Sequence, residues 1–349
     1  RLSEGSGDAV TDLAIERPAG AAHRRPRIGF LGVGWIGRHR MEHMLKTGAV
    51  EAVAVSDPFD GAVADAQALA PAAARVADLD ALLAQDLDGL VIATPSAVHA
   101  EQTIRALEAG VAVFCQKPLG RNRAETEAAI DAARAADRLL GVDLSYRFTE
   151  GVRRIRELLQ AGELGHVHAI DLTFHNAYGP DKPWFYDPAL SGGGCVMDLG
   201  VHLVDLALWL LGSPKVVEVS SHLFSEGRPL KSRDKAEDYA VATLVLEGGT
   251  VVRLACSWKL PAGQDAVISA GFYGSGGGAE MRNVGGSFYD FTTERFRGTS
   301  REILASPPED WGGRAAADWA RRMAAGERFD PSIAGLIEVA DVLDRIYRI

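Results

Sequence analysis

The sequence predicts an α/β protein, with a Rossmann-like, doubly wound parallel sheet followed by an α+β domain that has a large, mainly antiparallel open sheet. Between residues 27 and 143, short β-rich runs alternate with alanine-rich helical stretches, which is the pattern of repeated β-α-β units. After Tyr146 the alternation gives way to strands separated by turns. We therefore expect an irregular arm at 1–26, a first domain at 27–145 and a second at 146–349.

The elements of the first domain follow from its periodicity. Apolar, β-branched runs predict strands, and alanine-rich stretches with a helical period predict the helices between them. The expected strands are 28–33, 52–56, 89–93, 111–114 and 140–144, and the expected helices are 36–46, 61–69, 79–83, 97–109 and 123–136.

The second domain begins with helical periodicity and continues mainly as strands. Helices are expected at 151–160, 201–211, 314–325 and 333–347. Strands are expected at 167–174, 216–221, 239–246, 250–257, 266–273 and 288–292. A loop rich in proline, glycine and aromatic residues separates the first of these strands from the second helix.

Composition argues against several classes of partner. The formal net charge of -10 repels nucleic-acid phosphates and anionic membranes. Three cysteines form no CxxC pair, which suits a reducing compartment, so the cytoplasm is expected. The apolar run at 203–211 is too short to cross a bilayer, and no HExxH or CxxC spacing predicts a metal.

A glycine motif follows the first expected strand. Gly32, Gly34 and Gly37 match GxGxxG and open a helix, which is the context of a dinucleotide site. The first glycine permits a tight turn, the second lets the backbone approach a pyrophosphate, and the third allows close packing of the helix. The helix N-terminus then offers N–H groups to the phosphates.

The choice of dinucleotide depends on Asp57. This residue ends the second strand, 20 residues after Gly37, where a carboxylate accepts hydrogen bonds from ribose hydroxyls and repels a 2′-phosphate. NAD is therefore preferred over NADP, unless Asp57 only forms the turn before Pro58. A second glycine run at 274–278 precedes no helical pattern, so we expect no phosphate site there.

Four motifs in order resemble the Gfo/Idh/MocA oxidoreductases. They are the segment 28–37, then Ala93-Thr94-Pro95-Ser96 with His99, then Gln116-Lys117-Pro118, and then 192–202 with Asp198 and His202 in DxxxH spacing. The resemblance runs from Arg27 to near the C-terminus. It implies two domains: a Rossmann domain that binds NAD(P), and a second domain for substrate binding and oligomerisation.

The resemblance implies a catalytic set of Lys117, Asp198 and His202. Residues four apart share one helix face, so Asp198 and His202 can converge on one substrate hydroxyl. His202 suits a general base or acid, Asp198 an orienting group and Lys117 a partner in proton transfer; either Lys117 or His202 can be the principal base. The alternatives are a surface lysine, a helix-capping aspartate and a packed core histidine.

Gln116 stands where the family motif has a glutamate, which removes a negative charge that would favour a protonated Lys117. We expect a Gln116→Glu change to move the pH dependence of turnover.

Further contacts with substrate are expected from Lys117, Asp198, His202, Tyr146, Arg147 and Trp184. Trp184 lies on a loop that also carries Lys182 and Tyr186. His99 and Trp184 are also consistent with simple packing. The residues expected to line the cofactor site are Gly32, Gly34, Trp35, Ile36, Gly37, Asp57, Ala93, Thr94, Pro95, His99, Gln116 and Lys117.

The expected activity is hydride transfer between NAD(H) and a secondary alcohol or ketone of a sugar, sugar acid, cyclitol or related polyol. Two alternatives stay open: a glycosidase that uses NAD without net redox change, and a catalytically silent NAD-binding regulator. The resemblance also implies a homodimer or homotetramer.

Overall fold

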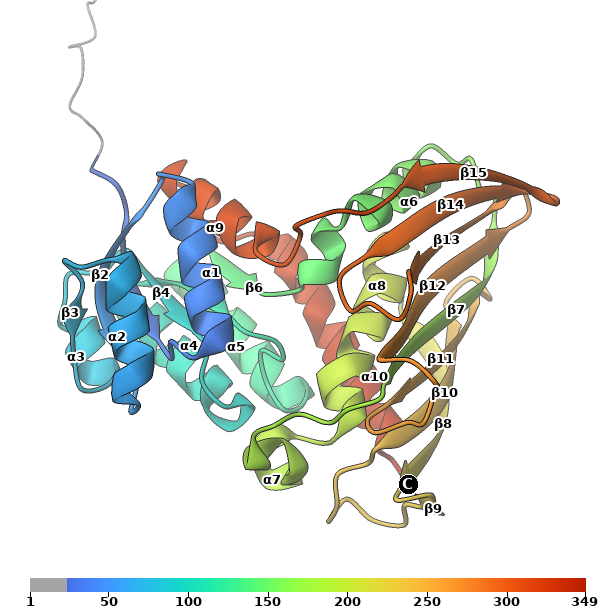
Figure 1. Ribbon diagram of the computed structural model, residues 1–349, viewed down its shortest axis with the longest axis horizontal. Coiled ribbons are helices and arrows are strands. Elements are labelled where there is room, and N and C mark those ends of the chain that lie inside the picture. The colour runs from blue at the N-terminus through green and yellow to red at the C-terminus, as the bar shows by residue number, and fades with distance from the viewer. Residues whose placement is uncertain (1–23) are drawn as a thin grey trace, which may run out of the picture.

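The computed structural model describes residues 24–349 and shows two sheets with a cluster of helices between them (Figure 1). The first sheet has six parallel strands in the order β3-β2-β1-β4-β5-β6. This is the doubly wound order, and it confirms the predicted class of the first domain. Its strands are β1 (Arg27–Leu31), β2 (Glu51–Ser56), β3 (Ala74–Arg75), β4 (Gly89–Ile92), β5 (Ala112–Cys115) and β6 (Leu140–Val142).

Helices cover both faces of this sheet because its strands are apolar on both sides. One core joins the strands to Met41 of α1, Val63 of α2 and Trp319 of α9. The other joins them to helices α3, α4 and α5, through residues such as Leu107 and Ile130. The helices are α1 (Trp35–Lys46), α2 (Asp60–Leu69), α3 (Leu79–Leu83), α4 (His99–Glu108), α5 (Arg123–Ala136) and α9 (Arg314–Ala324).

Helix α9 comes late in the chain but packs on the first sheet. Its Trp319 is fully buried, and two strand glycines make room for the indole. A Cβ built on Gly89 of β4 would lie 2.7 Å from the ring, and one on Gly141 of β6 would lie 2.8 Å from it. The end of the chain therefore ties the second domain back to the first.

The second sheet has nine strands in the order β15-β14-β13-β12-β7-β11-β10-β8-β9. Only β7 and β11 pair in parallel, so the sheet is mainly antiparallel, as predicted. Its strands are β7 (Val167–Asn176), β8 (Val216–Ser225), β9 (Arg228–Pro229), β10 (Tyr239–Leu246), β11 (Val251–Ser257), β12 (Ala266–Gly274), β13 (Gly278–Asn283), β14 (Phe291–Arg297) and β15 (Ser300–Ala305).

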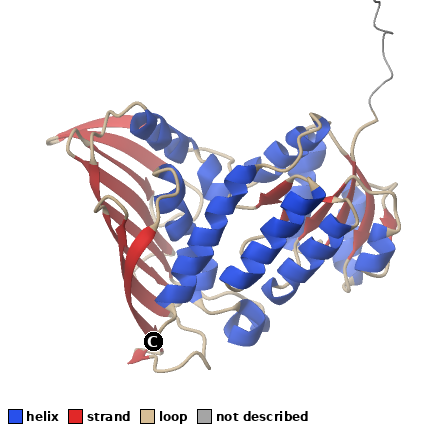
Figure 2. Cartoon of the chain, turned by 180° about the vertical axis from the view of Figure 1, so that it is seen from behind, coloured by secondary structure: helices blue, strands red, loops and turns tan. Residues whose placement is uncertain are grey.

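Helices pack on one face of the large sheet, between it and the first domain, and Figure 2 shows the same arrangement from behind. They are α6 (Glu150–Gln160), α8 (Val201–Leu210) and α10 (Gly335–Ile346). A short α7 (Pro188–Ser191) and a π-helical turn (Val196–Gly200) precede α8. This π turn carries Asp198, so the second domain brings that residue toward the first.

Some elements differ from the expectation. The sequence did not predict β3, β9, β13 or β15, and β14 begins at Phe291, three residues later than the start of the strand expected at 288–292. The glycine run 274–278 joins β12 to β13 in an antiparallel pair, which confirms that no helix follows it. Residues 1–23 of the expected arm lie outside the described residues.

Candidate active site

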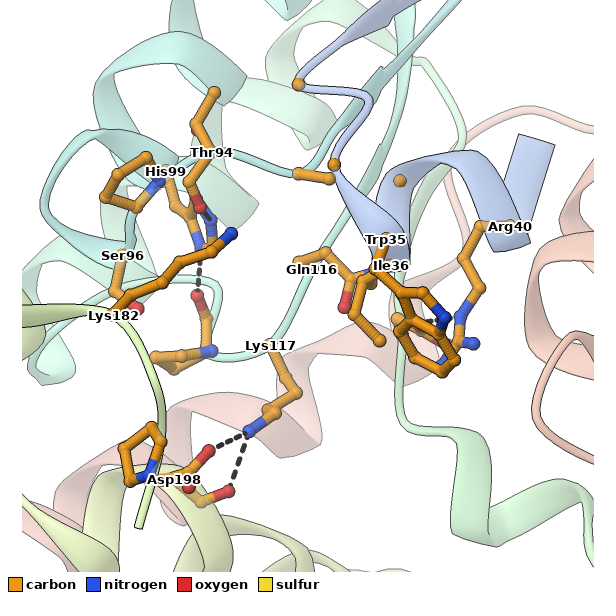
Figure 3. Close-up of a pocket in the computed structure, with 18 of the residues that line it drawn as sticks. Trp35, Ile36, Arg40, Thr94, Ser96, His99, Gln116, Lys117, Lys182 and Asp198 are labelled. Carbon is orange, nitrogen blue, oxygen red and sulfur yellow. Dashed lines mark hydrogen bonds and ion pairs between the residues drawn. The ribbon is translucent and has the colours of Figure 1, made fainter. Parts of the chain in front are cut away.

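A cleft of about 1920 Å³ runs between the two domains. The glycine turn and the ends of β4 and β5 form one wall. The loop after β7, the π turn and the start of α8 form the other. Figure 3 shows Lys117 and Asp198 facing each other across this cleft.

The glycine turn has the shape that a dinucleotide needs. Gly32 has φ +86°, and a Cβ on it would lie 2.4 Å from the Ala93 carbonyl oxygen. A Cβ on Gly37 would lie 2.3 Å from the Gly32 carbonyl oxygen. A Cβ on Gly34 would meet only Lys182 Nζ, at 3.7 Å. No side chain caps α1 and no acidic residue occupies its first turn. Its N–H groups are left for phosphate oxygens, so these residues fit a dinucleotide.

Asp57 fixes the glycine turn to the end of β2. Its Oδ2 accepts a hydrogen bond from the Val33 N–H at 2.9 Å, and its Oδ1 accepts one from the Phe59 N–H at 2.9 Å. Each carboxylate oxygen has a second lone pair, and Asp57 lines the cleft. It can therefore hold the turn and still accept from ribose hydroxyls.

His99 joins two loops under the cleft. Its Nδ1 lies 2.7 Å from the Pro118 carbonyl oxygen and its Nε2 lies 2.6 Å from the Thr94 carbonyl oxygen. The side chain is buried, and burial lowers its pKa. His99 thus fixes the loops after β4 and β5, and Ala93, Thr94, Pro95 and Ser96 line the cleft beside it.

Lys117, Asp198 and Trp258 form a connected group. Lys117 Nζ donates to Asp198 Oδ1 at 2.8 Å and to the Asp198 carbonyl oxygen at 2.7 Å. Trp258 Nε1 donates to Asp198 Oδ2 at 3.0 Å. Two hydrogens of an ammonium are thus used, and the third can reach a substrate oxygen. Trp258 was not among the predicted site residues, because it follows β11 and belongs to no motif.

A buried carboxylate holds the segment that leads into the π turn. Glu237 accepts hydrogen bonds from the Gly194 N–H at 3.0 Å, the Val196 N–H at 2.9 Å and the Tyr347 hydroxyl at 2.6 Å. Burial raises the pKa of Glu237, and these three donors oppose that shift. Sequence reasoning missed this residue too, because its donors come from distant segments.

His202 lies in the cleft wall with its ring edge against Tyr146, at 4.8 Å between ring centroids. Within residues 24–349, its ring nitrogens have no hydrogen-bond partner. Burial lowers the pKa of His202 well below its ordinary value, and the charges of Lys117 and Arg40 lower it further. The imidazole is therefore neutral near pH 7 and can accept a proton.

Arg147 does not reach the cleft, which corrects the substrate-binding role expected for it. Its guanidinium forms a bidentate ion pair with the buried carboxylate of Asp205, in which Nε donates to Oδ2 at 2.8 Å. The guanidinium also lies over the Trp209 ring. This ion pair holds the guanidinium inside the second domain, and Arg147 is not among the residues that line the cleft. Tyr146, Trp184, Trp35 and Ile36 do line the cleft.

His39, His43 and Asp310 place three possible metal-ligand atoms within 4.8 Å of one another at the cleft mouth. The Arg40 guanidinium donates to His39 Nδ1 at 2.7 Å, so the neutral ring keeps its proton on Nε2 and has no free lone pair. We therefore describe these residues as a hydrogen-bonded cluster.

Two further features belong to the core. The stretch Pro188–Leu210 is long and apolar enough for a membrane span, but 89% of its 18-residue apolar segment is buried inside the protein.

Cys195 is also buried, and burial raises the pKa of its thiol. A buried, protonated thiol is a poor nucleophile.

The sequence is similar to those of known proteins. An oxidoreductase family model with an NAD-binding Rossmann fold matches residues 26–144, and the GFO/IDH/MocA C-terminal domain matches residues 152–280. The chain is 31% identical over 271 residues to a putative UDP-kanosamine synthase oxidoreductase subunit of Amycolatopsis mediterranei, covering 73% of this chain and 75% of that protein. It is 28% identical over 280 residues to the inositol 2-dehydrogenase of Rhizobium meliloti, covering 79% and 78%.

Solved structures share the fold. GenD2 from gentamicin A biosynthesis, in complex with NAD, superposes with a TM-score of 0.78 at 24% identity, covering 95% of this chain and 96% of that one. Levoglucosan dehydrogenase, in complex with NADH and levoglucosan, superposes with a TM-score of 0.79 at 20% identity, covering 93% and 96%. Together with the sequence matches, the cleft and its glycine turn show that the chain belongs to the GFO/IDH/MocA family of NAD(P)-dependent oxidoreductases.

Proposed function

We propose that this chain transfers a hydride between NAD(H) and a secondary alcohol or ketone carbon of a sugar, sugar acid, cyclitol or related polyol. One observation carries the proposal: the Lys117 ammonium and the neutral His202 line the same cleft that begins at the glycine turn. Relatives named D-glucoside 3-dehydrogenase, from Escherichia coli, and inositol 2-dehydrogenase support this substrate class.

The proposed chemistry divides between two side chains. Lys117, held by Asp198, donates its remaining hydrogen to the oxygen at the reacting carbon and orients it. Neutral His202 accepts the hydroxyl proton while the carbon–hydrogen bond breaks and the C=O bond forms. NAD, when bound, supplies the acceptor for the hydride. In the reverse direction His202 returns the proton to the oxygen.

Asp57 supports NAD over NADP. Its carboxylate faces the cleft at the end of β2, and a 2′-phosphate there would meet a negative charge. Asp57→Ser should raise the catalytic efficiency with NADP relative to NAD by about tenfold or more. An unchanged ratio would remove this support.

The assembly proposed is a homodimer or homotetramer that uses the bare face of the nine-stranded sheet. This face carries no helix within the described chain (Figures 1 and 2). Val217 on β8 and Ile303 on β15, two strands of this sheet, are 62% and 66% exposed, and association would bury apolar side chains of this kind. Sedimentation velocity tests this proposal.

We also propose a cytoplasmic location, which the three free, buried cysteines support.

The experiment for the activity is a panel of sugars, sugar acids and inositols incubated with purified protein and NAD, with NADH absorbance as the readout. A substrate-dependent rise in NADH supports the proposal. Glycoside cleavage without NADH would favour the glycosidase alternative. NAD binding with no turnover of any compound would favour the silent regulator.

A further inference from the structure

A lysine from the second domain lies over the glycine turn of the first. A Cβ built on Gly34 would lie 3.7 Å from Lys182 Nζ, and no other heavy atom beyond the neighbouring backbone lies within 4 Å of it. Lys182 sits on the loop between β7 and α7 and extends across the cleft toward Thr94 and Ser96 (Figure 3). The amine thus occupies otherwise open space above the N-terminus of α1.

The other strong cations that line the cleft already have carboxylate partners. Lys117 pairs with Asp198, Arg40 with Asp143 and Arg105 with Asp80. Within residues 24–349, by contrast, no carboxylate lies within 4.0 Å of Lys182 Nζ. An ammonium that reaches into a cleft without a partner is suited to an anionic ligand.

The turn beneath Lys182 is built for an anion. Helix α1 has free N–H groups at its start and no acidic side chain in its first turn. A dinucleotide places its pyrophosphate at this end of the helix. We propose that Lys182 is a ligand of the cofactor's pyrophosphate, contributed by the second domain to the glycine turn of the first, an inference that rests on the cofactor use proposed above.

The loop is braced in a way that holds Lys182 in this position. The Tyr186 hydroxyl donates to the Pro180 carbonyl oxygen at 2.8 Å, and Lys259 lies 4.7 Å from the centre of the Tyr186 ring. Tyr186 also packs edge-on against Trp258, the residue that donates to Asp198. The loop that carries Lys182 is therefore joined to the catalytic group by direct contacts.

Lys182 and Trp184 lie on the same loop, from which the sequence predicts contacts with substrate. The geometry separates the two side chains by function. Lys182 lies over the phosphate-binding turn, whereas Trp184 stacks on Phe185 at 3.9 Å between ring centroids and lines the cleft. One loop thus presents a cation to the cofactor and an aromatic ring to the space beside it.

The test measures the Kd of NADH, ADP-ribose and adenosine by calorimetry for the full chain and for Lys182→Ala. We expect the Kd of NADH and of ADP-ribose to rise about tenfold, since a charged hydrogen bond to phosphate is lost. The Kd of adenosine, which has no phosphate, should stay the same. Lys182→Arg should restore most of the affinity, and Lys231→Ala, an exposed lysine outside the cleft, should change none of the three values.

The outcomes separate this inference from the proposed function. If Lys182→Ala binds NADH as tightly as the unaltered chain, Lys182 is not a pyrophosphate ligand, although the cofactor use stands. An equal loss of affinity for adenosine would also overturn the inference, because the effect would not depend on phosphate. If the unaltered chain binds no NADH, the cofactor use and this inference fail together.

Discussion

Gln116 donates a hydrogen bond from its side-chain amide to Asp143 Oδ2 at 2.7 Å. The same oxygen accepts a hydrogen bond from Arg40 Nε at 2.6 Å, and both Arg40 and Asp143 are buried. Gln116 and Asp143 follow the neighbouring strands β5 and β6. The carboxylate that the family motif carries at position 116 is thus absent from this chain, and a carboxylate one strand away faces Arg40.

Gln116→Glu should therefore destabilise the protein rather than only alter turnover. The new carboxylate, itself partly buried, would face the buried carboxylate of Asp143, with a penalty of about 2 to 3 kcal/mol in the free energy of unfolding at pH 8. Urea denaturation measures this difference. The pKa of the new group would be raised, so the penalty should shrink as the pH falls toward about 4.

The matched control removes the negative charge at position 143 when one is added at position 116. Adding Asp143→Asn to Gln116→Glu restores one carboxylate and one amide in the pair, and most of the lost stability should return. Asp143→Asn alone should destabilise, because Arg40 then loses its charged partner. If the double variant is as unstable as the sum of the single variants, the two residues do not act as a pair.

The motif glycines Gly34 and Gly37 should respond differently to alanine. A Cβ on Gly37 meets the Gly32 carbonyl oxygen at 2.3 Å, so Gly37→Ala should cost about 3 kcal/mol of stability. A Cβ on Gly34 meets only Lys182 Nζ at 3.7 Å. Gly34→Ala should therefore fold normally but bind NADH at least about tenfold more weakly, because the methyl group occupies the space for phosphate. Thermal unfolding and NADH titration separate the two effects, and equal stability losses would contradict the account.

Trp258 should position Asp198 for catalysis. Trp258→Phe keeps an aromatic ring in the buried site but removes the Nε1–H that donates to Asp198 Oδ2. We expect kcat to fall about tenfold, with little change in the Kd of NADH. Steady-state kinetics and NADH titration test this. An unchanged kcat would show that Lys117 alone holds Asp198 in place.

His202 should set the acid limb of the oxidation rate. Burial, followed by the charges of Lys117 and Arg40, lowers its pKa below the ordinary 6.5, so the ring remains a proton acceptor below that pH. The profile of kcat/KM for oxidation should fall only below pH 6.5, and His202→Gln should lack this limb. A limb centred above 6.5 would assign the proton to another group.

The same shift links His202 to stability. In the unfolded chain the imidazole takes up a proton near pH 6.5, whereas the native state keeps it neutral to lower pH. The contribution of a neutral His202 to stability is therefore complete above pH 6.5 and is lost as the pH falls below it. The free energy of unfolding of His202→Gln should depend less on pH in this range.

The parts of the fold that depend on local patterns were predictable. The GxGxxG turn lies within a few residues of sequence, and its glycines occupy the positions that the motif implies. The nine-stranded sheet was predictable in kind, but its strands β9, β13 and β15 were missed, as was β3 of the first sheet, because their sequences are short or lack a clear alternation. The packing of α9 on the first sheet was not foreseen, since it depends on two glycines of distant strands that admit Trp319.

The site residues also divide into those that the sequence indicates and those that only the tertiary structure reveals. The proximity of Lys117 to Asp198, 81 residues apart, was expected from the family resemblance and not from any local pattern. Trp258 and Glu237 act through contacts that only the tertiary structure reveals. Arg147 was misassigned because its partner Asp205 lies on α8, and nothing in the sequence shows that they meet.

Lys117 and His202 together are expected to carry the proton transfer that accompanies hydride transfer to NAD. The direct test compares NADH formation by the unaltered chain, Lys117→Ala and His202→Ala on the same polyol substrate. We expect substrate-dependent NADH formation that falls at least about a hundredfold in each variant, while the Kd of NADH in His202→Ala stays within about threefold of the original. Full turnover in either variant would contradict this expectation.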